Sequence, residues 1–85
     1  MADEFILDAR EMAPPEPFDK AIEILQHMQP GQYLRMLHRR VPYPLFDFCS
    51  ALSLDYSFRE TPAADFEIII HFACDLETLR REGLL

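Results

Sequence analysis

The chain places basic side chains at two points where predicted strands end. Arg10 follows an N-terminal apolar stretch, and His38, Arg39 and Arg40 close a second one. Arginine and protonated histidine attract carboxylates and phosphates, as does the positive end of a helix dipole. Together with Glu16, at the start of a predicted helix, these residues form the candidate binding site, either an anion pocket or a docking edge for an acidic partner.

A structural role is the alternative for the arginines. Arg39 and Arg40 could pair with Glu11 and Glu16 across two loops and only fix the loop conformation. The same two acids oppose a strongly positive pocket. A protein partner that carries both signs of charge therefore fits this edge better than a free phosphate.

Two similar segments bring the candidate residues to one edge of the sheet. Each strand is followed by an arginine, Pro-x-Pro and then Phe-Asp, in residues 15–19 and again in residues 42–47. Proline is favoured in the first turn of a helix, so each segment is expected to begin one. Because the two preceding strands are expected to be parallel, both loops and both helix N-termini lie at the same edge.

Nucleophilic and metal chemistry have weaker candidates. Cys49 lies on the apolar face of a predicted helix, where a thiol is a small hydrophobic group, and Cys74 follows the last strand. His71 and Cys74 are spaced so that a strand would point them to opposite faces. We expect no catalytic residues, no metal site and no cofactor, although ligation of a metal or haem by His38, with a ligand from elsewhere, stays open.

Hydrophobic periodicity predicts the element order β-α-β-α-β-β-α. Alternating apolar residues indicate strands, and an i, i+3, i+4, i+7 spacing indicates helices. Strands are expected at residues 4–8, 33–38, 54–59 and 66–72, and helices at about 17–28, 44–52 and 75–83. Asp75 is the expected cap of the last helix, and residues 61–64 are the expected hairpin loop.

This order favours an α/β (α+β) two-layer sandwich, in which a four-stranded mixed sheet carries the first two helices on one face. The opposite face, with Ile69 and His71, needs a cover. Either the C-terminal helix folds back with its leucines, or a second subunit packs there. All 85 residues are expected to form one domain, with a core at about 4–73 and the C-terminal helix at about 75–83.

Composition narrows the class of protein. With 49% apolar residues and only two glycines, the chain is globular. A net charge of -7 argues against binding to nucleic acid or to a membrane surface. Two cysteines are too few for a disulfide scaffold, and the acids Asp3 and Glu4 stand where a secretory signal carries positive charge. A soluble, cytoplasmic protein is expected.

Residues 7–25 and 29–37 resemble the opening of the TusA/SirA-like family of small sulfur-relay proteins. That family has a strand, then Cys-Pro-x-Pro at the start of a helix, then a Pro-Gly turn into the next strand. The resemblance covers roughly residues 5–72 and implies the same fold. Its most specific piece is Pro15-Glu16-Pro17. Pro14 stands where the sulfur carriers have their persulfide-bearing cysteine, so the resemblance does not extend to sulfur carriage.

A closer resemblance is to an uncharacterised branch of that fold, a domain of unknown function often found beside hemerythrin-like domains. The branch keeps Asp-x-Arg, Pro-Pro-Glu-Pro and His-Arg-Arg-x-Pro-x-Pro-Leu. The matching residues are Asp8, Arg10, Pro14, Pro15, Glu16, Pro17, His38, Arg39, Arg40, Pro42, Pro44 and Leu45. The branch has no agreed activity, so the resemblance implies a fold and a location rather than a reaction.

The residues and the resemblance together favour a non-enzymatic interaction or adaptor module. It would dock a partner or an anion at the edge that holds Arg10, His38, Arg39 and Arg40. A protein partner is expected, with no nucleic acid and no membrane, and the chain itself is expected to be either a monomer with the C-terminal helix docked or a weak homodimer. The alternatives are an accessory component of sulfur transfer or redox chemistry, acting through a partner or Cys74, and a metal-, haem- or small-anion-binding domain centred on His38.

Overall fold

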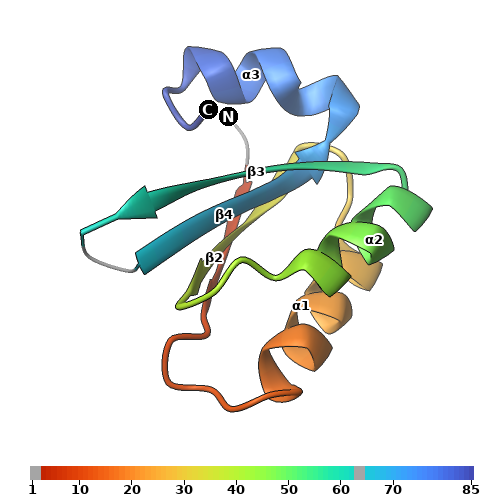
Figure 1. The fold of residues 1–85 in the computed structure, drawn as a ribbon. Helices are drawn as coiled ribbons and strands as arrows, with labels where there is room; N and C mark the ends of the chain where they lie inside the picture. The colour runs from red at the N-terminus through yellow and green to blue at the C-terminus, as the bar shows by residue number, and fades with distance from the viewer. Residues whose placement is uncertain (1–2, 63–64) are drawn as a thin grey trace.

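Four strands form one mixed sheet in the computed structural model, which describes residues 3–62 and 65–85 (Figure 1). The strands are β1 (Asp3–Asp8), β2 (Gln32–His38), β3 (Leu54–Thr61) and β4 (Asp65–Phe72), in the order β1-β2-β4-β3. β1 and β2 are parallel, and β4 is antiparallel to both of its neighbours. The α+β fold with a four-stranded mixed sheet is therefore confirmed.

Helices α1 (Glu16–His27) and α2 (Tyr43–Ala51) cover one face of the sheet (Figure 1). Each helix buries its apolar side against residues of β2 and β4, because alternate residues of these strands point to the same face. Phe18 of α1 and Phe48 of α2 meet edge to face, with ring centroids 6.5 Å apart. The side chains buried in this layer include Ala21, Leu25, Leu34, Met36, Leu45, Cys49, Ile68 and Ile70.

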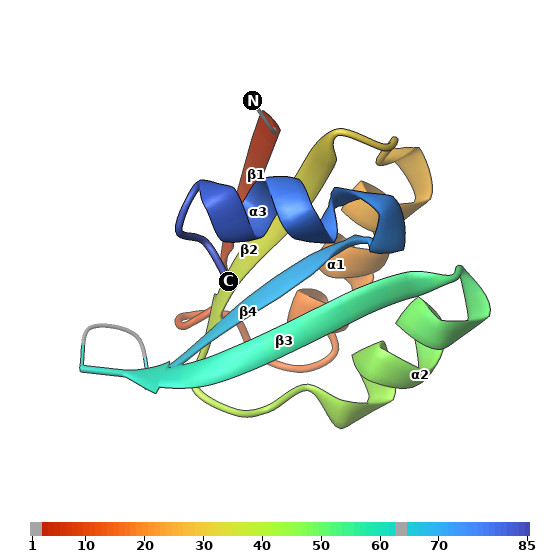
Figure 2. The same cartoon turned by 90° about the horizontal axis from the view of Figure 1, so that it is seen from above.

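The C-terminal helix α3 (Leu76–Arg81) packs on the opposite face of the sheet (Figure 2). Its Leu79 is fully buried and forms a small second core with Tyr33 of β2 and Ile69 of β4. Beneath this layer His71 is only 2% exposed, and its Nδ1 lies 2.9 Å from the carbonyl oxygen of Phe72. Of the two covers considered for this face, the folded-back helix is the one observed.

Some element ends differ from the sequence-based expectations. α1 begins one residue earlier than predicted and α2 also begins one residue before its proline, so each helix has its proline in the first turn. A 3₁₀ turn (Ala73–Asp75) precedes α3, and the carboxylate of Asp75 accepts a hydrogen bond from the Gly31 N–H at 2.8 Å. Asp75 thus binds a distant turn instead of capping the helix with its side chain. Of the predicted hairpin loop, residues 63–64 lie outside the described residues.

No helix in the described part of the chain is both long enough and apolar enough to cross a membrane.

Candidate functional site

Two loops, residues 9–15 and 39–42, lie side by side at one end of the sheet. They follow β1 and β2, which are parallel neighbours, so both chains leave the sheet at the same edge. The Ala9 N–H donates to the Leu37 carbonyl at 2.8 Å and continues the strand pairing into the first loop. We call this end of the molecule the loop edge, and it contains the basic residues selected from the sequence.

The loop edge encloses a pocket of about 330 Å³ between the start of α1 and the start of α2. Both Pro-x-Pro segments contribute to its wall. Its lining consists of Pro14, Pro15, Pro17, Phe18, Met36, His38, Arg40, Val41, Pro42, Pro44 and Leu45. We call it the proline pocket. Apart from His38 and Arg40, all of these lining side chains are apolar, so the pocket suits an apolar group that ends in a polar or acidic one.

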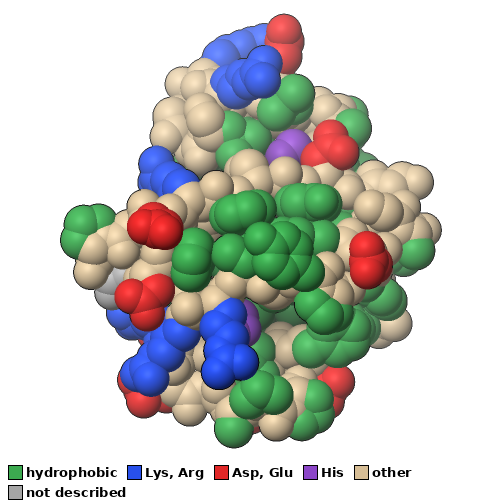
Figure 3. Space-filling model, viewed as in Figure 1, with side chains coloured by type: hydrophobic (Ala, Val, Ile, Leu, Met, Phe, Trp, Pro, Cys, Tyr) green, Lys and Arg blue, Asp and Glu red, His purple; other side chains and the backbone are tan. Residues whose placement is uncertain are grey.

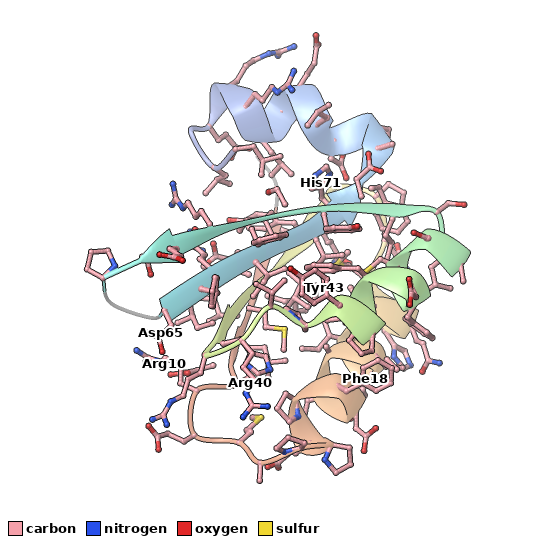
Figure 4. All side chains as sticks on the ribbon, viewed as in Figure 1. Arg10, Phe18, Arg40, Tyr43, Asp65 and His71 are labelled. Carbon is pink, nitrogen blue, oxygen red and sulfur yellow. The ribbon has the colours of Figure 1, made fainter. Side chains whose placement is uncertain are left out.

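A second hollow of about 280 Å³ adjoins the proline pocket. Residues 9–14 line it together with His38, Arg39 and Arg40. Pro14, His38 and Arg40 border both spaces, so these three residues stand between an apolar pocket and a basic one. In Figure 4 the labelled side chains of Arg40 and Phe18 lie at this end of the molecule, while His71 lies across the sheet near α3.

His38 is held by its own loop. Its Nδ1 lies 3.2 Å from the backbone nitrogen of Arg40, and because an amide N–H can only donate, Nδ1 is the acceptor. The neutral ring therefore carries its proton on Nε2. Burial, and then the charge of Arg40, lower the pKa of His38. At neutral pH the imidazole is an uncharged hydrogen-bond donor in the wall of the pocket.

The three arginines of the loop edge differ in their partners. Arg10 makes a two-pronged ion pair with Asp8, at 2.8 and 2.7 Å, and these hydrogen bonds lower the pKa of Asp8 to about 2. Arg39 pairs with Glu11 at 3.3 Å, with both side chains mostly in solvent. Within residues 3–62 and 65–85, Arg40 has no carboxylate within 4 Å. Arg40 is therefore the cation that remains available to a ligand.

The helix N-termini offer fewer free N–H groups to an anion than the sequence suggested. The N–H of Glu16 donates to Ala13, that of Tyr43 to Val41 and that of Leu45 to Pro42, at 2.9 to 3.0 Å. Pro17 and Pro44 have no N–H to offer. Since loop carbonyls accept hydrogen bonds from these amide groups, the side chain of Arg40 and the ring of His38 are the donors left for an acidic ligand at the proline pocket.

The structure brings four of the five sequence-selected residues together. Arg10, His38, Arg39 and Arg40 all line the basic hollow, whereas Glu16 is exposed and lines neither space. The apolar wall of the proline pocket was not identified from the sequence. The two Pro-x-Pro segments were the available signal, because similar loops after parallel neighbouring strands must meet at one edge.

An exposed aromatic patch also lies near the loop edge. The ring of Phe46 in α2 stacks on Tyr56 of β3, with centroids 3.8 Å apart and planes at 6°. Phe58 lies beside it at 5.6 Å, and Tyr43 meets it edge-on at 6.0 Å. Tyr43, Tyr56 and Phe58 are 66%, 41% and 43% exposed. Figure 3 shows hydrophobic side chains gathered over β3 and α2, with basic side chains directly below. The alternation of residues 54–59 predicted the strand that carries Tyr56 and Phe58 but did not identify this patch.

The two thiols differ in access. Cys49 is fully buried in the helical layer, and burial raises the pKa of its thiol to about 11. Cys74 is exposed in the turn before α3. The buried position predicted for Cys49 is confirmed. Among the residues that the structure describes, no three His, Cys, Asp or Glu side chains are grouped so that they could hold a metal ion.

Comparison with known proteins gives a family match. Residues 6–72 match the family described as Uncharacterized conserved protein (DUF2249). The match runs from Ile6, within β1, to the end of β4 and therefore includes both loops of the loop edge, but not α3. No curated protein matches the chain.

Proposed function

The chain belongs to the DUF2249 family of uncharacterised conserved proteins, and we propose that it is a non-enzymatic docking module for a protein partner. The proline pocket would receive a segment of the partner that places an apolar side chain next to a carboxylate. The observation that carries this proposal is the position of Arg40, which borders an apolar pocket and has no ion pair within the described residues.

The apolar wall supports a protein segment as the ligand. The proline rings and Phe18 present an apolar surface in the pocket. A hydrated inorganic anion makes no favourable contact with this surface, whereas a leucine or phenylalanine side chain would bury apolar area against it. Proline also has little conformational freedom to lose on binding. Binding of an apolar group in the pocket would therefore cost little conformational entropy.

The charges at the loop edge support one acidic group rather than many. Arg10 and Arg39 already have acidic partners, and the chain as a whole carries a net charge of -7. A multiply charged phosphate would meet this overall repulsion with one available arginine. A single carboxylate, hydrogen-bonded by Arg40 and by Nε2–H of His38, matches the donors that the pocket offers.

The proposal can be tested by NMR with defined peptides. A capped peptide in which leucines flank one glutamate should shift the amide signals of Phe18, Val41 and Leu45, since these residues line the pocket. Its glutamine counterpart should bind more weakly. Inorganic phosphate serves as the comparison. If phosphate shifts the same signals at lower concentration than the peptide, the site binds small anions and the docking proposal is wrong.

A role in sulfur transfer is the second candidate, and the exposed thiol of Cys74 is the observation in its favour. The element order also supports the likeness to the TusA/SirA-like fold. However, Pro14 occupies the position before Pro-x-Pro, and a proline can carry no persulfide. Cys74 lies in the turn after β4, whereas the loop edge lies at the ends of β1 and β2. This role would therefore be accessory, with the sulfur chemistry performed by a partner.

A further inference from the structure

β3 forms an outer edge of the sheet, as Figure 2 shows. Within the described residues it pairs with β4 alone, and the pairing runs without interruption from Leu54 opposite Phe72 to Thr61 opposite Asp65. Natural edge strands are commonly protected by a bulge, a proline or charged side chains. β3 has no bulge and no proline, and its charged residues are Asp55, Arg59 and Glu60. Its outer N–H and C=O groups therefore form a regular row on which another strand can pair.

The sequence of this strand is complementary to itself. In an antiparallel pair of two copies related by a two-fold axis, residues on the same face must lie opposite each other. With the axis at Ser57, Asp55 lies opposite Arg59 of the other copy, and Tyr56 lies opposite Phe58. Each contact occurs twice. One face then has two ion pairs, and the other has two aromatic pairs, which are favourable cross-strand combinations.

We propose that β3 pairs with β3 of a second copy in this register, joining two four-stranded sheets across a two-fold axis at Ser57. The pairing would cover the exposed rings of Tyr56 and Phe58, which are 41% and 43% exposed in the single chain. It adds a self-association surface to the docking role proposed above and does not depend on it.

The side chains on β3 are available for this contact. Asp55 has no ion pair within residues 3–62 and 65–85. Arg59 binds Glu67 at 2.9 Å through one terminal nitrogen, but the side chain is 67% exposed, and a guanidinium has five N–H donors. Arg59 can therefore bind Glu67 and the second copy's Asp55 together.

The opposite edge of the sheet is less suited to self-pairing. β1 has acids at three of its six positions and no basic residue. When two copies of β1 are paired antiparallel with residues of the same face opposite each other, no register places an acidic residue opposite a basic one. The axis at Phe58, which also keeps the faces of β3 matched, sets Tyr56 opposite Glu60 and Asp55 opposite Thr61. Charge complementarity thus selects β3 and the axis at Ser57.

A charge exchange tests the register in solution. Sedimentation velocity of the full chain over a concentration series, at about 0.15 M salt, should show a monomer–dimer equilibrium. Asp55→Arg and Arg59→Asp each place like charges opposite one another twice, so each variant should weaken the dimer by about tenfold or more. An equimolar mixture of the two variants restores both ion pairs and should dimerise again. Arg81→Asp, on α3, is the control and should leave the dimer unchanged.

A cross-link tests the axis directly. Directly opposite Cα atoms of an antiparallel pair are about 4.5–5.5 Å apart, which suits a disulfide. In a Cys74→Ser background, Ser57→Cys should form a disulfide-linked dimer under mild oxidation, whereas Thr78→Cys on α3 should not. A wild-type chain that stays monomeric at all concentrations, or cross-linking that is equal for the two variants, would overturn the proposal. So would a mixture of the charge variants that remains monomeric although each variant is folded by circular dichroism.

Discussion

The backbone N–H of Arg40 donates a hydrogen bond to Nδ1 of His38 at 3.2 Å. The hydrogen bond sets the tautomer of the neutral ring, and Nε2 becomes the donor. A proton on Nδ1 would remove the acceptor and place a positive charge beside Arg40 in a partly buried position. The neutral ring is therefore part of the folded loop, and its titration reports on that loop.

The first prediction concerns this titration. Burial and Arg40 lower the pKa of His38, so an NMR titration of the ring signals should give a midpoint below the usual value of about 6.5. The unfolded chain binds this proton more readily. The contribution of His38 to stability is thus present above about pH 6.5 and is lost as the pH falls through the lower pKa of the folded state.

The variant Arg40→Gln separates the two causes. Removal of the neighbouring charge should raise the midpoint of His38 only in part, because burial is the larger cause. Arg81→Gln, on the distant α3, should leave it unchanged. A wild-type midpoint above about 6.5 would contradict the environment described for this ring.

The second prediction concerns the ring of Phe46, which is 4% exposed and stacked on Tyr56. Phe46→Ala should lower the free energy of unfolding by about 3–5 kcal/mol, since it removes a buried ring and leaves a cavity. Tyr43→Ala is the matched control. Tyr43 touches the same ring but is 66% exposed, so its loss should be less than about 1 kcal/mol. Urea unfolding measures both, and equal losses would show that Phe46 is not the centre of the patch.

The third prediction concerns the access of the two thiols. A thiol reagent added to the folded protein should modify Cys74 quickly, because it is exposed, and should leave Cys49 unmodified until the chain unfolds. The raised pKa of Cys49, about 11, keeps its thiol protonated as well as buried. Mass spectrometry of the intact chain counts the modified sites. Two equally fast modifications would mean that the helical layer opens readily.

The fourth prediction concerns sulfur transfer. Incubation with a cysteine desulfurase and free cysteine should give no stoichiometric addition of one sulfur atom, because Pro14 occupies the carrier position. The variant Cys74→Ser provides the comparison. A complete adduct on the wild-type chain that disappears in this variant would establish Cys74 as a carrier and would favour the second candidate function.

Local pattern was sufficient to predict most of the fold. Alternation in residues 66–72 and helical spacing in residues 17–28 are properties of short segments, and both elements are observed within one residue of those bounds. The strand order was not predicted. β3 and β4 both alternate in sequence, and only the pairing of β4 with β2 places β3 at the edge and exposes Tyr56.

The candidate site was predictable in its charges but not in its shape. His38, Arg39 and Arg40 are adjacent in sequence, so their clustering needs no tertiary information. The wall of the proline pocket cannot be predicted without tertiary information, because Phe18 and Val41 line the same pocket only when both loops fold at one edge. Asp75 shows the same limit. Its sequence position suits a helix cap, but its carboxylate binds the distant N–H of Gly31.

A double-mutant cycle measures whether Arg40 binds a carboxylate beside the apolar pocket. Calorimetry or NMR would give the affinities of the wild-type chain and of Arg40→Gln for the leucine–glutamate peptide and for its glutamine counterpart. Each single change should weaken binding about fivefold or more, and the second change should then cost little further, because the broken ion pair is the same. If the two losses multiply, or if Arg40→Gln binds the glutamate peptide as well as the wild type does, Arg40 does not contact the carboxylate and the proposed docking site is wrong.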